Sequence, residues 1–206
     1  RVVLKGAALT GAGGGFPAPP DLFEFLKRYV LLCPVALFEP PQLLNAVWDL
    51  AVANLAFANH VDASPDGAKE NVVFLASIAK RAAAGDAARR GRLRSRGARA
   101  VRALAAALAG NTPSTLRPAL ADCLHSLCVP DAPLARAWLD AALVDDPTFD
   151  DRVLPRNDKA RVRDALCALL PEKPKFKALA VDLAKLACGE TSLDALLAYE
   201  LPAAAQ

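Results

Sequence analysis

Apolar residues recur at helical spacing along most of the chain. In residues 173–189, KPKFKALAVDLAKLACG, the side chains of Phe176, Leu179, Leu183 and Leu186 share one face of a helix. Gly189 follows at the position where a residue in the left-handed conformation most easily ends a helix. No segment shows the sustained alternation of apolar and polar residues that is typical of a strand. The pattern therefore predicts an all-α protein.

Polar residues and prolines mark the expected starts of the other helices. Five polar residues precede apolar stripes at positions where a side chain can cap the first turn: Asp21, Ser64, Ser114, Asp131 and Asn157. Glu24 follows Asp21 by three positions, as in a capping box. Pro65 and Pro118 fall in first turns, where a missing N–H costs least.

The spacing of these starts indicates a repeat. The first helices of four pairs begin at Asp21, Ser64, Ser114 and Asn157. The intervals are 43, 50 and 43 residues, near the ~40–47 residues of two-helix HEAT-type repeats. Because one pair cannot bury its own apolar stripe, neighbouring pairs stack on each other. We therefore expect an α-solenoid of HEAT-like antiparallel helix pairs.

The predicted division of the chain follows from these intervals. Residues 1–19 are expected to hold a helix remnant and a flexible linker, and residues 191–206 a short terminal helix and a tail. The four predicted pairs span residues 20–58, 64–110, 113–145 and 156–189.

Positive charge is concentrated in one segment. Lys80 to Arg102 holds nine Lys or Arg and one acid, Asp86; this +8 leaves −5 for the rest of a chain with a net charge of +3. A nucleic-acid-binding domain usually has a basic stripe over a whole face, so nucleic acid is not the expected partner. Gly85, Gly91 and Gly97 disfavour a continuous helix. We therefore expect an Arg-rich loop at residues 85–98, inside the longest of the three intervals.

The arginines of this predicted loop are the candidate site residues, because a guanidinium can clamp a carboxylate or phosphate at two points. The candidates for contact with an acidic partner are Arg89, Arg90, Arg92, Arg94, Arg96 and Arg99. Three interpretations stay open: a solvated insertion, contact with an acidic or phosphorylated protein, and contact with RNA. RNA binding would depend steeply on salt and would be lost on alanine replacement of Arg90, Arg92, Arg94 and Arg96.

Few residues could carry out catalysis or hold a cofactor. His60 and His125 are the only histidines. In CLHSLC, Cys123, His125 and Cys128 would point to different sides of a helix, which does not suit tetrahedral zinc. The GAGGG run at residues 11–15 lacks the GK[ST] ending of a phosphate loop. We expect no enzyme, metal or cofactor.

Composition adds three expectations. The apolar runs are short and interrupted by proline, so we expect no membrane span. The five cysteines lie mostly in apolar helical patterns, which indicates reduced, buried thiols. The chain begins at Arg1 and contains no Met, so we expect a piece of a longer polypeptide.

Four strings, at residues 20–38, 58–81, 116–143 and 164–189, carry a family resemblance. They begin PDLFEFLKRY, ANHVDASPDG, LRPALADCLH and DALCALLPEK. Their order and spacing over roughly residues 20–190 resemble the C-terminal HEAT repeats of karyopherin-β nuclear transport receptors of the importin-13 / transportin-3 (transportin-SR) type. The matching positions are His60, Asp62, Ala63 and Phe74 in and after the family's His-x-Asp-Ala loop, and Trp138, its repeat-packing tryptophan.

The resemblance implies a superhelix that binds protein cargo, contacts nucleoporins and shuttles between nucleus and cytoplasm. Ran-GTP would bind through repeats outside this chain. Receptors of the transportin-SR type bind phosphorylated cargo with an arginine-rich helix of an upstream repeat; because the run here is expected to be a loop, that role is not transferred. The alternatives are an RNA- or phosphoprotein-binding helical-repeat module that uses the Arg-rich loop, and a generic HEAT scaffold.

Overall fold

The described part of the protein is built from helices alone. The computed structural model describes residues 20–56, 65–110 and 112–198, and within these ranges there is no strand. The helices are α1 (Pro20–Leu32), α2 (Pro34–Phe38), α3 (Pro41–Asn54), α4 (Pro65–Ala83), α5 (Ala87–Ala109), α6 (Arg117–Cys128), α7 (Ala132–Leu139), the π-helical turn η2 (Asp140–Val144), α8 (Arg156–Ala168), α9 (Lys173–Ala187) and α10 (Leu193–Leu197). The all-α prediction is confirmed.

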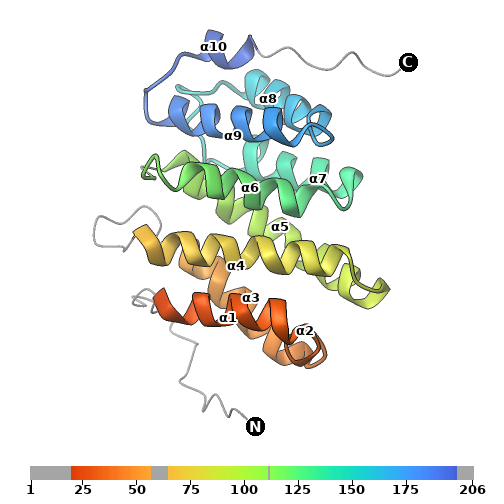
Figure 1. Ribbon diagram of the computed structural model, residues 1–206. Helices are drawn as coiled ribbons and strands as arrows, with labels where there is room; N and C mark the ends of the chain where they lie inside the picture. Colours follow the sequence, from red (N-terminus) through yellow and green to blue (C-terminus); the bar gives the residue numbers. More distant parts are fainter. Residues whose placement is uncertain (1–19, 57–64, 111, 199–206) are drawn as a thin grey trace.

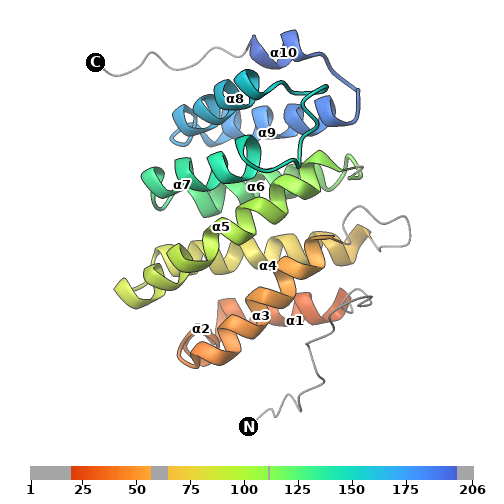
Figure 2. The same ribbon diagram turned by 180° about the vertical axis from the view of Figure 1, so that it is seen from behind.

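The helices stack in two layers. Layer one consists of α1, α4, α6 and α9, each packed on the next (Figure 1). Layer two, seen from behind, consists of α3, α5, α7 with η2, and α8 (Figure 2). Within each layer, a helix of one pair packs on a helix of the next pair. The apolar stripes of the helices are buried by this stacking.

The last pair enters the stack in the opposite order. In the first three pairs the first helix lies in layer one and the second in layer two, whereas α8 packs on α7 and η2, and α9 packs on α6. The chain reaches α8 through the loop after η2, whose Phe149 and Leu154 are buried in the core. This loop leads the chain along layer two, so the interval of 43 residues before Asn157 does not mark a simple repetition of the earlier pairs.

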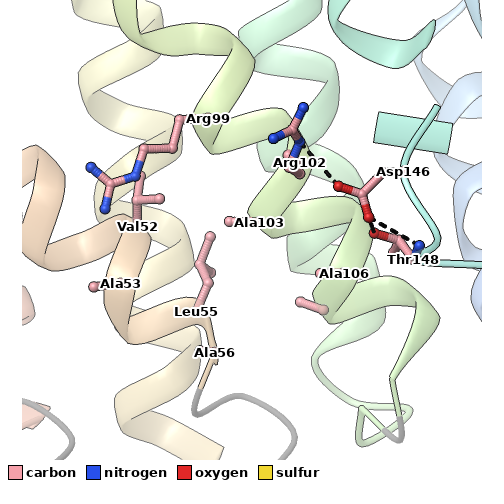
Figure 3. A pocket seen from close by; sticks show the side chains of 11 residues that line it. Val52, Ala53, Leu55, Ala56, Arg99, Arg102, Ala103, Ala106, Asp146 and Thr148 are labelled. Atoms are coloured by element: carbon pink, nitrogen blue, oxygen red, sulfur yellow. Dashed lines mark hydrogen bonds and ion pairs between the residues drawn. The ribbon is translucent and has the colours of Figure 1, made fainter. Parts of the chain in front are cut away.

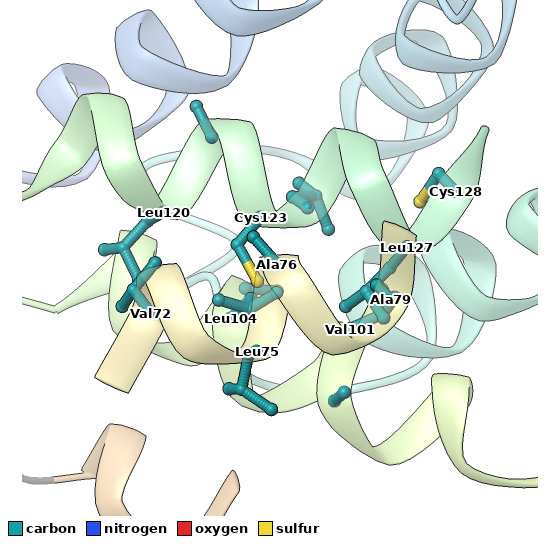
Figure 4. Packing of buried hydrophobic residues seen from close by; sticks show 14 of the residues in the cluster. Val72, Leu75, Ala76, Ala79, Val101, Leu104, Leu120, Cys123, Leu127 and Cys128 are labelled. Atoms are coloured by element: carbon teal, nitrogen blue, oxygen red, sulfur yellow. The ribbon is translucent and has the colours of Figure 1, made fainter. Parts of the chain in front are cut away.

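Small side chains bring α4 and α6 close together. Ala76 of α4 lies beside Cys123 of α6 and Ala79 beside Leu127, with Leu104 and Val101 of α5 below them (Figure 4). Burial raises the pKa of the Cys123 thiol well above its ordinary value, so this cysteine behaves as a small apolar residue.

The five cysteines are all free, but the expectation that they are buried holds only in part. Cys123 and Cys128 are buried, whereas Cys167 and Cys188 are half-buried and Cys33 is exposed. Cys33 lies in the one-residue break between α1 and α2, outside the apolar stripe of either helix.

Some of the predicted helix starts are confirmed. Asp131 caps α7 by accepting a hydrogen bond from the Leu134 N–H at 3.3 Å. Pro65 is the first residue of α4, and Pro118 lies in the first turn of α6. Ser64, the predicted cap of α4, lies outside the described residues.

Other predicted starts are displaced by one to three residues. Helix α8 begins one residue before Asn157, because the Pro155 carbonyl already accepts the Lys159 N–H at 2.9 Å. In the same way, α1 begins one residue before Asp21. Ser114 lies in a turn, and α6 begins only at Arg117.

The C-terminus of α9 is tied to the start of α6. Gly189 has a φ of +72°, and the Glu190 N–H donates to the Lys185 carbonyl at 2.8 Å, which is the predicted left-handed helix end. This turn presents the Glu190 carboxylate to the buried Arg117, whose two terminal nitrogens donate at 2.6 and 2.7 Å.

The described helices include none that is long and apolar enough to cross a membrane.

Candidate functional site

The arginine run is a helix, so the prediction of a loop at residues 85–98 is wrong. Helix α5 begins at Ala87, where the Asp86 carboxylate accepts the Arg89 N–H at 2.9 Å. This hydrogen bond, followed by the charge of the Arg89 side chain, lowers the pKa of Asp86 and keeps the cap ionised. A buried stripe that includes Leu93, Ala100 and Leu104 runs through the basic segment and packs it onto the core.

Gly97 is required by packing and does not interrupt the helix. A Cβ at this position would lie 2.3 Å from the Trp138 ring of α7, so only glycine lets the indole lie on α5. Trp138 is itself buried and joins the third pair to the second. Gly91 lies on the exposed side of α5, where a Cβ would have no atom within 4 Å, so packing does not require glycine at this position.

One set of arginines connects α5 to α2 and α3. Arg96 and Arg99 both bind Asp49 of α3, at 2.7 and 3.1 Å. Arg92 donates to the Phe38 carbonyl of α2, and the Arg89 guanidinium lies 5.5 Å from the centre of the Phe38 ring.

The other arginines have partners outside α2 and α3. Arg94 binds Asp131, the residue that caps α7, at 2.9 Å, and Arg102 binds Asp146 in the loop after η2 at 3.2 Å. Arg90 donates to the Gly85 carbonyl just before α5. All six predicted candidates thus have a partner in this chain, and Arg102, which the sequence did not single out, belongs to the same set.

A groove lies between α3 and α5 on layer two. Its larger part, with a volume of about 530 Å³, has an apolar floor and a polar rim that includes Arg99, Arg102 and Asp146 (Figure 3). The floor is formed by Val52, Ala53, Leu55, Ala56, Ala103, Ala106 and Ala107. The space stays open because most of these side chains are methyl groups, which are too short to fill the gap between two helices. We call this space, together with the hollow described next, the α3–α5 groove.

A second hollow of about 370 Å³ lies on the other side of Arg99. This hollow is lined by Trp48, Asp49, Ser95, Arg96 and Arg99, so Arg99 borders both parts. The Trp48 Nε1 is buried and, within the described residues, has no hydrogen-bond acceptor. A buried unpaired donor is uncommon in proteins, and this one belongs to a residue that lines the groove.

The remaining sequence candidates lie elsewhere. His125 is buried in α6, where its Nε2 lies 3.0 Å from the Leu170 carbonyl and its ring meets the edge of Phe176. Burial, which outweighs the hydrogen bond to Leu170, lowers the pKa of His125. No cluster of metal-ligating side chains occurs in the part of the chain that the structure describes. His60 lies outside the described residues.

The acidic loop after η2 is tied to neighbouring helices. Asp146 accepts hydrogen bonds from the Thr148 N–H and hydroxyl, in addition to its ion pair with Arg102. Asp151 binds the buried Lys159 of α8 at 2.6 Å. The loop is therefore held in place beside one end of the groove.

No family model, curated protein or solved structure matches the chain. The resemblance to karyopherin-β receptors therefore stays a prediction, and the site must be interpreted from its own geometry.

Proposed function

We propose that this protein is a scaffold that binds a segment of another protein in the α3–α5 groove. The observation that carries the proposal is the groove itself: an open apolar floor between two helices, bordered by guanidinium groups. Protein-binding grooves of this kind combine apolar area for affinity with a few polar groups for orientation. We propose no catalytic role.

The state of the arginines favours protein over RNA as the partner. All six arginines predicted from the sequence have a partner within the chain, and the six are directed to both sides of α5 instead of forming one basic face. Nucleic-acid binding normally uses a basic face whose charges are free to replace the counterions of phosphates.

A library of helical and extended 15-residue peptides, displayed on phage and selected on the protein, tests the scaffold function. We expect families of peptides whose binding is lost in Ala106→Trp, because the indole would fill the groove. Ala98→Trp is the matched control: Ala98 is exposed on the same helix and lines neither part of the groove. Absence of any enriched family, or families that bind both variants equally, would contradict the proposal.

We further propose that the scaffold belongs to a karyopherin-β nuclear transport receptor that shuttles between nucleus and cytoplasm with protein cargo. The support is the sequence resemblance together with helix pairs that stack in chain order from the first to the third. The test is binding of Ran to the full-length protein, measured by calorimetry with Ran loaded with GTP or GDP. We expect binding of the GTP form only; equal binding of both forms, or of neither, would refute this assignment.

A further inference from the structure

We infer that the occupant of the α3–α5 groove is an acidic amphipathic helix, whose carboxylates replace Asp49 and Asp146 as the partners of the arginine row Arg96, Arg99 and Arg102. This inference rests on the proposed scaffold function and specifies the chemistry of the partner. Three features of the groove support it: its length, the order of its charges, and the exposure of its ion pairs.

The length and floor of the groove suit a helix of about three turns. On α5 the groove extends from Ser95 to Ala107, which is about 18 Å at 1.5 Å per residue. Val52 and Leu55 lie at the bottom of the groove and are almost fully buried, so the accessible apolar surface comes mainly from the methyl groups of Ala53, Ala56, Ala103 and Ala106. On one face of a helix, apolar residues at i+3 and i+4 can meet such a floor while residues at i and i+7 reach its rim.

The charges of the groove select acidic residues at a defined spacing. Three arginines, Arg96, Arg99 and Arg102, share two carboxylates, Asp49 and Asp146, so these five groups carry a net charge of +1. Arg96 and Arg102 lie six residues apart, or about 9 Å along α5. Two carboxylates at positions i and i+7 of a helix lie about 10.5 Å apart and would reach the two ends of this row.

The internal ion pairs of the groove can exchange partners. The side chains of Arg99 and Arg102 are 63% and 57% exposed although each has a carboxylate partner. The Arg99–Asp49 pair is exposed at both groups, and such pairs contribute little to stability. In the Arg102–Asp146 pair Asp146 is only 23% exposed, but the guanidinium is accessible to a second carboxylate. An incoming carboxylate therefore replaces Asp49 with little loss, and Asp49 and Asp146 act as competitors for the partner.

Trp48 gives this exchange an optical signal. It lines the Asp49 end of the groove, and the only other tryptophan of the chain, Trp138, lies on the opposite side of α5 against Gly97. A change in Trp48 emission on titration therefore reports occupancy of the groove, and Trp48→Phe should abolish it.

The probe is a 14-residue alanine-based helix with Glu at positions 3 and 10 and Leu at positions 6 and 7, labelled for fluorescence anisotropy. Its comparator has Gln at positions 3 and 10. We expect the Glu peptide to bind the full chain at least tenfold more tightly than the Gln peptide. Arg99→Gln should weaken the Glu peptide about fivefold or more, whereas Asp49→Asn should tighten it about threefold.

Arg94→Gln is the matched control. The Arg94 side chain is 59% exposed, close to that of Arg99, and also binds an aspartate, but Asp131 lies on the α7 side of α5. We expect this variant to bind the Glu peptide as the wild type does. Because the side chains of Arg94, Arg99 and Asp49 are exposed by 42% or more, thermal unfolding followed by circular dichroism should show that these three variants are folded.

The outcomes separate this inference from the scaffold function. Equal binding of the Glu and Gln peptides, both lost in Ala106→Trp, would overturn the acidic partner and leave the scaffold function standing. The same conclusion would follow if the peptide families selected from the library bound in the groove but contained no acidic residues. Failure of both peptides and of the library would overturn both proposals. Displacement of the Glu peptide by poly(U) RNA, with Arg94→Gln weakened as much as Arg99→Gln, would identify a nucleic-acid surface instead.

Discussion

The two layers join neighbouring helices with opposite arrangements of charge. In layer one the central acid is Asp122 of α6, which binds Lys80 of α4 at 3.2 Å, and Lys173 and Lys177 of α9 at 2.6 and 3.5 Å. In layer two the central helix supplies the cations: α5 directs arginines to acids on both neighbours. Three stacked helices are thus connected by one acid in layer one and by a row of bases in layer two.

The difference lies in how much of each charge water can reach. The Asp122 side chain is only 24% exposed, and three ammonium groups converge on it. Burial raises the pKa of Asp122, but the hydrogen bonds from Lys173 and Lys80 outweigh it and lower the pKa to about 2. In layer two Asp49 is 42% exposed, whereas Asp131 and Asp146 are 17% and 23% exposed and thus as shielded as Asp122. We conclude that the charges around Asp122 mainly hold helices together, whereas those around Asp49 are the charges of layer two most available to a partner.

The largest effect that we expect comes from Gly97→Ala, because α5 joins layer two through apolar packing rather than through its arginines. The new methyl group would overlap the Trp138 ring, and overpacking of this kind costs about 3 kcal/mol of unfolding free energy. Urea denaturation followed by circular dichroism measures the loss.

Gly91→Ala is the matched control in the same helix. Its methyl group meets no atom within 4 Å, so the higher helix propensity of alanine should stabilise the protein by about 0.5–1 kcal/mol. Equal effects of the two substitutions would show that Gly97 is not a packing position, and a Trp138→Leu background should reduce the loss caused by Gly97→Ala if it is.

These glycines also show why the helices could be predicted and the site could not. Apolar periodicity located the long helices outside the basic segment, because a buried stripe is a local pattern. The loop prediction at residues 85–98 rested on the glycines, each of which disfavours a helix by about 1 kcal/mol relative to alanine. The buried stripe of Leu93, Ala100 and Leu104 continues through the run, and its packing outweighs this cost. That stripe was the available signal.

The groove and the arginine partners depend on residues far apart in the sequence. Arg96 binds Asp49, 47 residues away, and the groove exists because alanines of α3 and α5 face each other across layer two. No local pattern indicates which alanines face each other. The inverted order of α8 and α9 has the same origin, since it depends on where the loop with Phe149 and Leu154 is buried.

A smaller effect is expected from Asp122→Asn. The asparagine keeps the size of the side chain but leaves three lysines beside a neutral group, so we expect a loss of about 1–2 kcal/mol at pH 7. Because the pKa of Asp122 in the folded protein is lowered to about 2, its contribution is complete above the pKa of an unfolded aspartate, near 3.9, and disappears as the pH falls toward 2.

Urea denaturation of the wild type and Asp122→Asn at pH 7, 5, 4 and 2.5 checks this dependence. The difference in unfolding free energy should be similar at pH 7 and 5, begin to fall near pH 4 and be mostly lost at pH 2.5. A difference that stays constant across this range would mean that the lysines do not recognise the charge of Asp122.

The smallest effect that we expect is that of the same substitution in layer two, Asp49→Asn. Asp49 also binds two cations, Arg96 and Arg99, but its side chain is 42% exposed, so we expect a loss of at most about 0.5 kcal/mol. Added salt screens exposed charges more strongly than partly buried ones, and 0.5 M NaCl should remove this loss while leaving most of that of Asp122→Asn. If Asp49→Asn destabilised the protein as much as Asp122→Asn, the arginines of α5 would be structural in the same sense as the lysines of layer one. They would then be too strongly held to exchange Asp49 for a partner's carboxylate, and the two layers would not differ in function.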